Sequence, residues 1–198
     1  MRNFLDKLAS AEPTPGGGGA SALIASIGCC LCSMVANLTT GKKKYAQYQE
    51  KIEEHIEKLR ELNERLLSDI DKDAQAFKPL ASAYALDKST PGYEGIMEDA
   101  TYAAALAPLE ITRDIYELVP IIEELSVMGS RLAISDVAVA AAATRAAIDG
   151  IVMNVYINTK SLKDRQRAEA MNTEADEIVS DAAKRLNRVY SDIMSGMH

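Results

Sequence analysis

A turn of prolines and glycines, followed by a long run without charge, constrains the fold of this chain more than any other feature. Residues 13–19 read Pro-Thr-Pro-Gly-Gly-Gly-Gly, and no Asp, Glu, Lys or Arg follows until Lys42. The prolines and glycines end any regular element before them, and the small residues over 18–40 predict a helix, which Gly41 is placed to cap. A helix without a charged face has to be covered by protein or by lipid. We therefore expect residues 18–40 to form a central apolar helix.

The same run is also the one candidate for a membrane span. Its length fits a span, but six polar side chains interrupt it: Ser21, Ser26, Ser33, Asn37, Thr39 and Thr40. We favour a buried helix over a span, and hence no membrane partner. The first six residues contain no apolar signal region, and the three cysteines lie too close together, at 29–32, for a disulfide framework, so a cytoplasmic location is expected.

Composition limits the possible partners. The 198 residues carry a formal net charge of -7, which argues against nucleic acid as a partner. A local exception is the cluster Lys42, Lys43 and Lys44. The length suits one domain over 1–198, and the alanine-rich composition without Trp favours helices.

The rest of the sequence predicts further helices and no strand. Helices are expected over 3–10, 45–86, 96–118 and 121–128, with a kink at Pro79 and interruptions at Pro108 and Pro120. Ser135 is expected to cap another helix. Asp164 is expected to cap the last helix, whose apolar positions over 168–193 form a heptad seam that packs either within the subunit or against a second copy. The predicted fold class is all-α, a single-domain multi-helix bundle.

Asp73 stands out on the helix predicted over 45–86. The inward stripe of this helix is apolar except for Asn63 and Asp73. An inward carboxylate beside Ile70 and Phe77 is desolvated, which raises its pKa toward the range useful for proton transfer, and Asp69 one turn earlier is expected to push the pKa in the same direction. The alternative is that Asp73 caps another helix or pairs with an arginine, and the pattern leaves both open.

The glycine turn is the second candidate site. Glycines at a helix start expose backbone N–H groups that attract anions. Residues 17–22 formally satisfy G-x-G-x-x-A, but no strand precedes them and no acid follows at the required distance, so a dinucleotide fold is excluded. We favour a ligand-facing turn over a merely flexible one.

Two further polar pairs leave both interpretations open. Asn154 and Asn158 share a helix face and either bind a polar heterocycle or tie helices together. Ser135 and Asp136 are either a simple cap or part of a site. Neither the histidines nor the cysteines lie in a pattern that predicts a metal site.

The motifs, taken in order, resemble those of a known family. They are Pro13-Thr-Pro-Gly-Gly-Gly, Ser33-Met-Val-Ala-Asn-Leu-Thr39-x-Gly41-Lys-Lys, Asp73-Ala-Gln-Ala-Phe77, Ala107-Pro-Leu109, Ser135-Asp136-x-x-Val139-Ala140 and Asn154-Val-Tyr-Ile-Asn158. Together they resemble the cyclodeaminase/cyclohydrolase family of one-carbon folate metabolism over residues 13 to 164. Ser130 is a departure, since the family usually has Asn after the glycine that stands here at 129.

The resemblance implies an all-helical homodimer that binds a tetrahydrofolate derivative near the glycine turn without a metal or cofactor. The family's catalytic carboxylate falls on Asp73, as general acid and base. Lys42, Lys43 and Lys44 are expected to attract the glutamate tail of a polyglutamylated folate. The other substrate-binding residues expected from the resemblance are Pro15, Gly16, Gly17, Gly18, Ser135, Asp136, Asn154 and Asn158.

Two reactions fit this resemblance. The first is that of a formiminotetrahydrofolate cyclodeaminase, which forms 5,10-methenyltetrahydrofolate and ammonia. The alternative is that of a methenyltetrahydrofolate cyclohydrolase, which gives 10-formyltetrahydrofolate. A third possibility is a non-catalytic helical binding module.

Overall fold

Long helices account for nearly all of residues 2–197, the part of the chain that the computed structural model describes. Two 3-10 turns, Lys43–Tyr48 and Arg131–Ala133, join some of them, and no strand occurs among these residues. The all-α prediction is therefore confirmed. The helices are α1 (Arg2–Leu8), α2 (Gly17–Thr39), α3 (Gln49–Tyr84), α4 (Tyr93–Tyr116), α5 (Leu118–Met128), α6 (Ile134–Thr159) and α7 (Arg165–Ser195).

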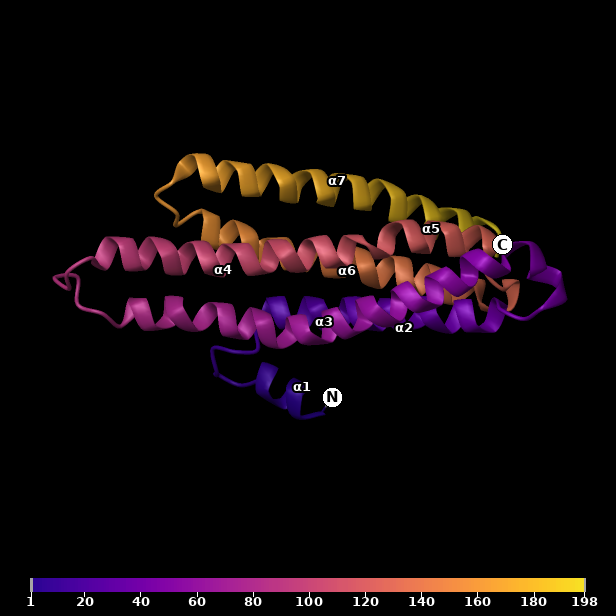
Figure 1. The fold of residues 1–198 in the computed structure, drawn as a ribbon, viewed down its shortest axis with the longest axis horizontal. Helices are drawn as coiled ribbons and strands as arrows, with labels where there is room; N and C mark the ends of the chain where they lie inside the picture. The colour runs from indigo at the N-terminus through magenta and orange to yellow at the C-terminus, as the bar shows by residue number, and fades with distance from the viewer. Residues whose placement is uncertain (1, 198) are drawn as a thin grey trace.

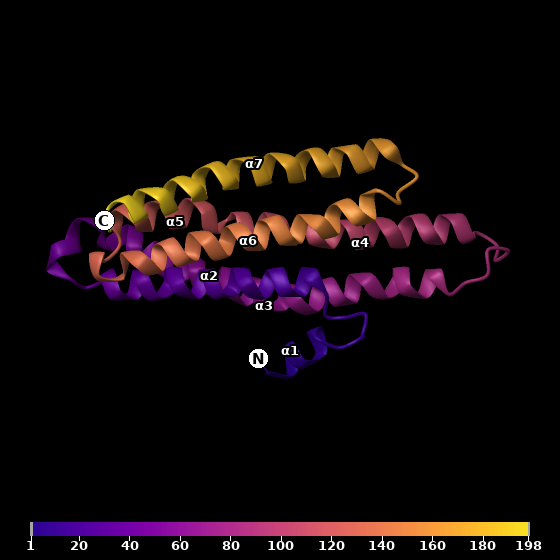
Figure 2. The same cartoon turned by 180° about the vertical axis from the view of Figure 1, so that it is seen from behind.

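The helices form an elongated bundle in which α2 packs against both α3 and α6 (Figure 1). Helix α6 also packs against α4 and α7, and α3 packs against α4. Figures 1 and 2 both show α7 along one side of the bundle, α2 and α3 along the other, and α1 projecting beyond them. Helix α1 buries none of its residues.

Small residues let α2 approach its neighbours closely. A Cβ atom added at Gly28 would lie 3.0 Å from Thr144 Oγ1 and 3.4 Å from the Ala140 carbonyl oxygen, so α6 fits against bare backbone here. The inner side of α2 is fully buried at Ala22, Ala25, Cys29, Cys32, Val35 and Ala36. Among residues 2–197, α2 is also the one helix long and apolar enough to cross a membrane by length and composition, and 56% of its most apolar window is buried inside the bundle.

The outer side of α2 remains uncovered. Ile24, Ile27, Met34 and Leu38 are between 36% and 46% exposed, although they belong to a helix without charge. The expectation of a central helix is therefore confirmed for one side of α2 only. We call these four residues, with the half-buried Leu31 between them, the α2 stripe.

Several predicted helix ends need correction. Pro108 lies inside α4 rather than interrupting it, and α5 begins at Leu118, so that Pro120 falls in its first turn, where a missing N–H is tolerated. Ser135 is not a cap: the 3-10 turn Arg131–Ala133 leads directly into α6, whose first residue is Ile134. Helix α3 continues through Pro79 to Tyr84.

Other predicted ends are confirmed. Gly41 follows α2 with a φ of +71°, a conformation that glycine adopts without strain. The Asp164 side chain accepts a hydrogen bond of 3.0 Å from the Arg167 N–H and so caps α7.

The heptad seam of α7 packs within the subunit. Seven of its eight apolar residues are at most 8% exposed, Ile178 is half-buried, and α7 contacts α4, α5 and α6. The choice that spacing left open is thus settled in favour of an internal seam, formed by Ala168, Met171, Ala175, Ile178, Ala182, Leu186, Val189 and Ile193.

Candidate active site

Asp73 faces a small polar cavity of about 150 Å³ where the glycine turn, α3, α4 and α6 meet. The structure therefore brings together three of the features singled out in the sequence: the glycine turn, Asp73 and the asparagine pair. The cavity is lined by Pro13, Thr14, Gly16, Asp73, Phe77, Ala104, Asn154 and Asn158.

The Asp73 carboxylate packs against the glycines at the start of α2. Asp73 Oδ2 accepts a hydrogen bond of 3.2 Å from the Gly19 N–H. A Cβ atom at Gly18 would lie within 2.5 Å of that same oxygen and closer still to the rest of the carboxyl group. Glycine is required at 18 because the carboxylate of α3 fills the space of a side chain.

The environment of Asp73 favours proton transfer. Burial raises the pKa of Asp73 above its ordinary value, and the hydrogen bond from Gly19 opposes that rise. The predicted contribution of Asp69 is wrong, because the Asp69 carboxyl group is turned toward α4 and does not contribute to the pKa shift of Asp73. There it meets Asp114 of α4, and burial followed by the Asp114 charge raises the pKa of Asp69 to about 6.

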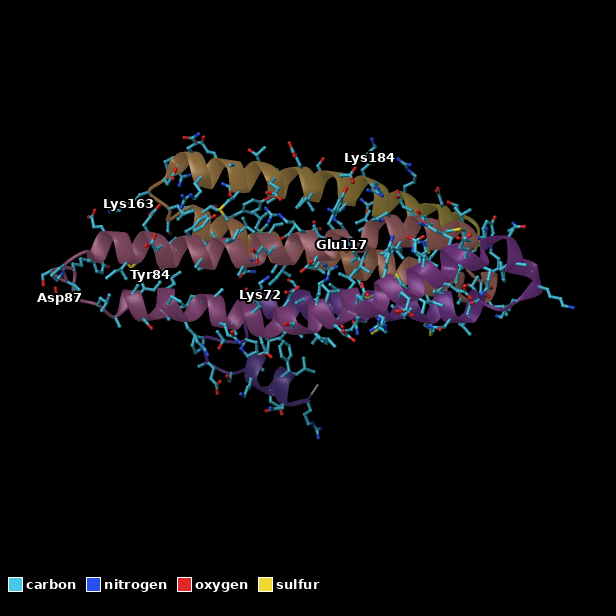
Figure 3. All side chains as sticks on the ribbon, viewed as in Figure 1. Lys72, Tyr84, Asp87, Glu117, Lys163 and Lys184 are labelled. Carbon is cyan, nitrogen blue, oxygen red and sulfur yellow. The ribbon has the colours of Figure 1, made fainter. Side chains whose placement is uncertain are left out.

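Cations surround this second carboxyl group. Lys72, which projects between α3 and α4 (Figure 3), lies 4.0 Å from Asp69 and 2.7 Å from Glu110. Arg65 pairs with Asp114 at 3.2 Å and with Glu117 at 2.7 Å. One Asp69 oxygen is buried without a hydrogen-bond partner among the described residues. Asp69 is therefore a buried group of the α3–α4 contact, separate from the Asp73 cavity.

Pro108 fixes the position of Asn158. A proline has no N–H, so the Ala104 carbonyl one turn earlier receives no helical hydrogen bond from it. Instead, Asn158 Nδ2 donates to this carbonyl at 2.8 Å and to the Asn154 carbonyl at 2.9 Å. Asn158 thus ties α6 to α4, as one of its two interpretations proposed. The sequence predicts only a helix break at Pro108, although a proline within a helical pattern always frees the carbonyl four residues before it.

The two asparagines offer different groups to a ligand. Both Nδ2 hydrogens of Asn158 are engaged, so its Oδ1 remains as an acceptor. Within residues 2–197, no hydrogen bond engages the Asn154 side chain, and its Nδ2 would lie 3.6 Å from a Cβ atom at Gly17. The cavity therefore combines one titratable carboxyl group with amide groups that can orient a polar heterocycle.

The remaining predicted site residues lie at the opposite end of α2. Its 23 residues span about 34 Å at 1.5 Å per residue, and Lys42, Lys43 and Lys44 follow its far end. Ser135 and Asp136 start α6 at that same end, where the Arg131 N–H donates to the Tyr45 hydroxyl at 3.0 Å. A single subunit does not bring these five residues to Asp73.

A larger groove of about 850 Å³ lies between α3 and α5, apart from Asp73. Its basic side chains are matched by acidic ones, such as His55 with Glu124 at 2.6 Å and Arg65 with Glu117 at 2.7 Å. Among residues 2–197, no group of three or more His, Cys, Asp or Glu side chains is arranged to hold a metal ion.

Residues 1–177 match the formiminotransferase-cyclodeaminase family. The chain is 35% identical to a methenyltetrahydrofolate cyclohydrolase of Methylorubrum extorquens, over 98% of this chain and 96% of that protein. It is 29% identical to the formimidoyltransferase-cyclodeaminase of Mus musculus, over 83% of this chain and 31% of that protein. The structure of a formiminotetrahydrofolate cyclodeaminase from Thermotoga maritima superposes with a TM-score of 0.92 at 28% identity, covering 100% of this chain and 96% of that one.

The chain therefore belongs to the formiminotransferase-cyclodeaminase family of one-carbon folate enzymes. It spans about a third of the length of the animal relatives and nearly the full length of the two bacterial proteins.

Proposed function

We propose that the protein is a methenyltetrahydrofolate cyclohydrolase that opens the one-carbon bridge between N5 and N10 with Asp73 as acid and base. The observation that carries this proposal is the partly desolvated Asp73 carboxyl group, held at the Gly19 N–H in a cavity with Asn154 and Asn158. Similarity to a cyclohydrolase along nearly the whole of both chains supports hydrolysis as the reaction.

Asp73 carries the proton in this mechanism. As water attacks the methenyl carbon, the carboxylate takes a proton from it, and a tetrahedral carbon between N5 and N10 results. The carboxyl group then returns a proton to N5 as the carbon–N5 bond breaks and the carbinol oxygen loses its own. The products are 10-formyltetrahydrofolate and one proton. Asn154 and Asn158 orient the pterin, and the proposed reaction needs no metal or cofactor.

Cyclodeamination is the second candidate. The Thermotoga maritima structure with this fold is described as a formiminotetrahydrofolate cyclodeaminase. The raised pKa of Asp73 suits this reaction too, because a carboxyl group that remains protonated nearer neutral pH can protonate the departing ammonia. Both reactions pass through a tetrahedral carbon, so one carboxyl group serves either.

A spectroscopic assay separates the two reactions. Supplied with methenyltetrahydrofolate, a cyclohydrolase removes the methenyl absorbance. Supplied with formiminotetrahydrofolate, a cyclodeaminase produces it. Asp73→Asn should lower kcat by about 10²–10⁴, the usual contribution of a general acid–base group. Asp71→Asn, at an exposed position on the same helix, is the control and should keep its activity.

Two outcomes would overturn this assignment. Near-normal turnover by Asp73→Asn would remove Asp73 from the mechanism. If the wild-type protein turned over neither substrate and no folate raised its melting temperature, the non-catalytic binding module would replace the enzyme.

We also propose that the protein is a cytoplasmic homodimer joined through the α2 stripe. An uncharged stripe of five apolar side chains along one helix, four of them exposed, is typical of a surface covered by a partner. Met34→Asp should therefore give a monomer in sedimentation, whereas Met194→Asp on α7 should leave the dimer intact. Met34 is 40% and Met194 37% exposed, and α7 lies on the far side of the bundle from α2 (Figure 2). A wild-type monomer at micromolar concentration would refute the dimer.

A further inference from the structure

The predicted site residues fall into two groups at opposite ends of α2. The group around Asp73 contains the carboxyl group and the amides, while the group at the far end contains Lys42, Lys43 and Lys44. Among the described residues, none of these lysines forms an ion pair with an acidic side chain, and Lys44 Nζ lies 5.6 Å from the centre of the Tyr45 ring. The far group is thus a cluster of available cations about 34 Å from the cavity along α2.

The α2 stripe has the symmetry that a twofold dimer requires. In a twofold interface each copy presents the same surface, so the contact has to be complementary to itself. The exposed side chains lie in pairs on either side of Leu31: Ile27 and Met34 near it, Ile24 and Leu38 further out. Two α2 helices that cross antiparallel at Leu31 therefore place Ile24 against the partner's Leu38 and Ile27 against the partner's Met34.

This pairing also fixes the register of the helix ends. When Ile24 faces the partner's Leu38, the end of the partner's α2 at Thr39 lies beside Leu23, and the segment that follows it, with the partner's Lys42, Lys43 and Lys44, lies toward the first turn of α2 at residues 17–20. Packed helices lie about 8–10 Å apart, so the partner's lysines come to the glycine turn, which lines the Asp73 cavity. In such a dimer the partner's lysines lie near the Asp73 cavity, although the lysines of the same subunit are about 34 Å away from it along α2.

We propose that Lys42, Lys43 and Lys44 of each subunit complete the substrate site of the other and hold the anionic tail of the folate there. This inference rests on the proposed folate reaction and on the α2 dimer. The tail is a chain of carboxylates, which the protein's net charge of -7 repels and a local cluster of cations attracts. The positive end of the α2 dipole lies at the same place and adds to the attraction.

The charges that face the proposed tail site come from both subunits. Asp73 contributes the one carboxyl group of the cavity, and the partner's Asp136 lies at the start of α6, at the same end as the lysines. The partner's Arg131 in the neighbouring 3-10 turn adds a further cation. The sum of these side chains remains positive, which suits a ligand with several carboxylates.

Mixed dimers test whether the lysines act across the interface. One subunit carries Asp73→Asn, and the other carries Lys42→Ala, Lys43→Ala and Lys44→Ala. If the lysines serve the partner, the mixed dimer contains one complete site, with Asp73 from the second subunit and the lysines from the first. If they serve their own subunit, every site lacks either Asp73 or the lysines.

Lysines that serve the partner's site and lysines that serve their own subunit predict different KM values for a polyglutamylated substrate. The triple-lysine homodimer should have a KM about tenfold above the wild-type value, equivalent to about 1.4 kcal/mol of binding. The mixed dimer, purified through two different affinity tags, should return to the wild-type KM with about half the wild-type kcat. A mixed dimer that keeps the raised KM would overturn the proposal, and so would an unchanged KM in the triple-lysine homodimer.

Controls separate this outcome from a failure of the reaction itself. Lys88→Ala, Lys163→Ala and Lys184→Ala together remove the same charge from exposed positions in other parts of the chain, and this variant should keep the wild-type KM. A monoglutamyl substrate should show a smaller difference between the variants than the polyglutamylated one. A wild-type protein that turns over no folate would refute the proposed reaction, whereas an active wild type with a raised KM in the mixed dimer would refute only the contribution across the interface.

Discussion

Replacing Gly18 with alanine should disable Asp73 while leaving the fold intact. The new Cβ would lie within 2.5 Å of Asp73 Oδ2, where ordinary contacts begin at 3.4 Å. The carboxyl group therefore has to move by about 1 Å, and a displacement of that size at a reacting group lowers kcat by about 10²-fold. The movement also breaks the hydrogen bond of 3.2 Å from the Gly19 N–H.

The backbone of α2 should tolerate this change. Gly18 has a helical backbone, and alanine in a helix is favoured over glycine by about 0.5–1 kcal/mol. This gain opposes the strain of the displaced carboxyl group, so we expect Gly18→Ala to fold and to melt within a few degrees of the wild type.

The assay compares kcat for Gly18→Ala with kcat for Gly95→Ala. Gly95 also lies in the first turn of a helix, α4, and a Cβ atom there meets nothing within 4 Å. The control therefore reports the effect of alanine on a helix start without a clash, and it should keep wild-type kcat. Wild-type kcat in a folded Gly18→Ala would refute the reasoning, because the Asp73 carboxyl group would then act away from its observed position and without the hydrogen bond from the Gly19 N–H.

Two further predictions concern stability. Because burial raises the pKa of Asp69 from 3.8 to about 6, the folded protein binds a proton that the unfolded chain releases, so the stability that this carboxyl group contributes below pH 4 is lost as the pH rises through 6. Asp69→Asn should remove that pH dependence and raise the unfolding free energy at pH 7 by about 3 kcal/mol in urea titrations, and an unchanged pH profile would contradict it. Asn158→Ala should lower stability by about 1–2 kcal/mol, because the Ala104 carbonyl loses its donor. In a Pro108→Ala background the restored N–H should remove most of that loss, and equal losses in both backgrounds would contradict the assigned role of Pro108.

Local patterns in the sequence were sufficient for most of the helices and for the inward position of Asp73 on α3. The misplaced polar position at Asp73 faces the cavity, and its carboxylate accepts a hydrogen bond from the Gly19 N–H in the first turn of α2, so the alternative that Asp73 caps another helix is confirmed and its catalytic role stays a prediction. The direction of Asp69 was not predictable in the same way. It lies one turn from Asp73, yet it faces α4, and the sequence does not say on which side α4 packs.

Two other predictions from the sequence were wrong or only partly right: the helix break at Pro108 and the full burial of α2. A missing N–H normally ends a helix, so the sequence predicts a break at Pro108, but Asn158, which is 50 residues away, supplies the replacement donor. The outer side of α2 was expected to be covered because it has no charge. Residues 2–197 leave that side exposed in the single subunit, and no pattern along one sequence shows which side of an uncharged helix its own chain covers.

The position of α2 in the chain has a consequence for synthesis. Its two main packing partners are α3 and α6, and α6 ends at Thr159, about 120 residues after α2 ends at Thr39. At about 5–20 residues per second, translation takes roughly 6–24 s to cover that distance. During this interval the nascent chain carries a complete helix that is long and apolar enough to enter a lipid bilayer. The side of α2 that α6 covers in the finished bundle therefore stays exposed on the ribosome-bound chain after α3 has been made and until α6 is complete.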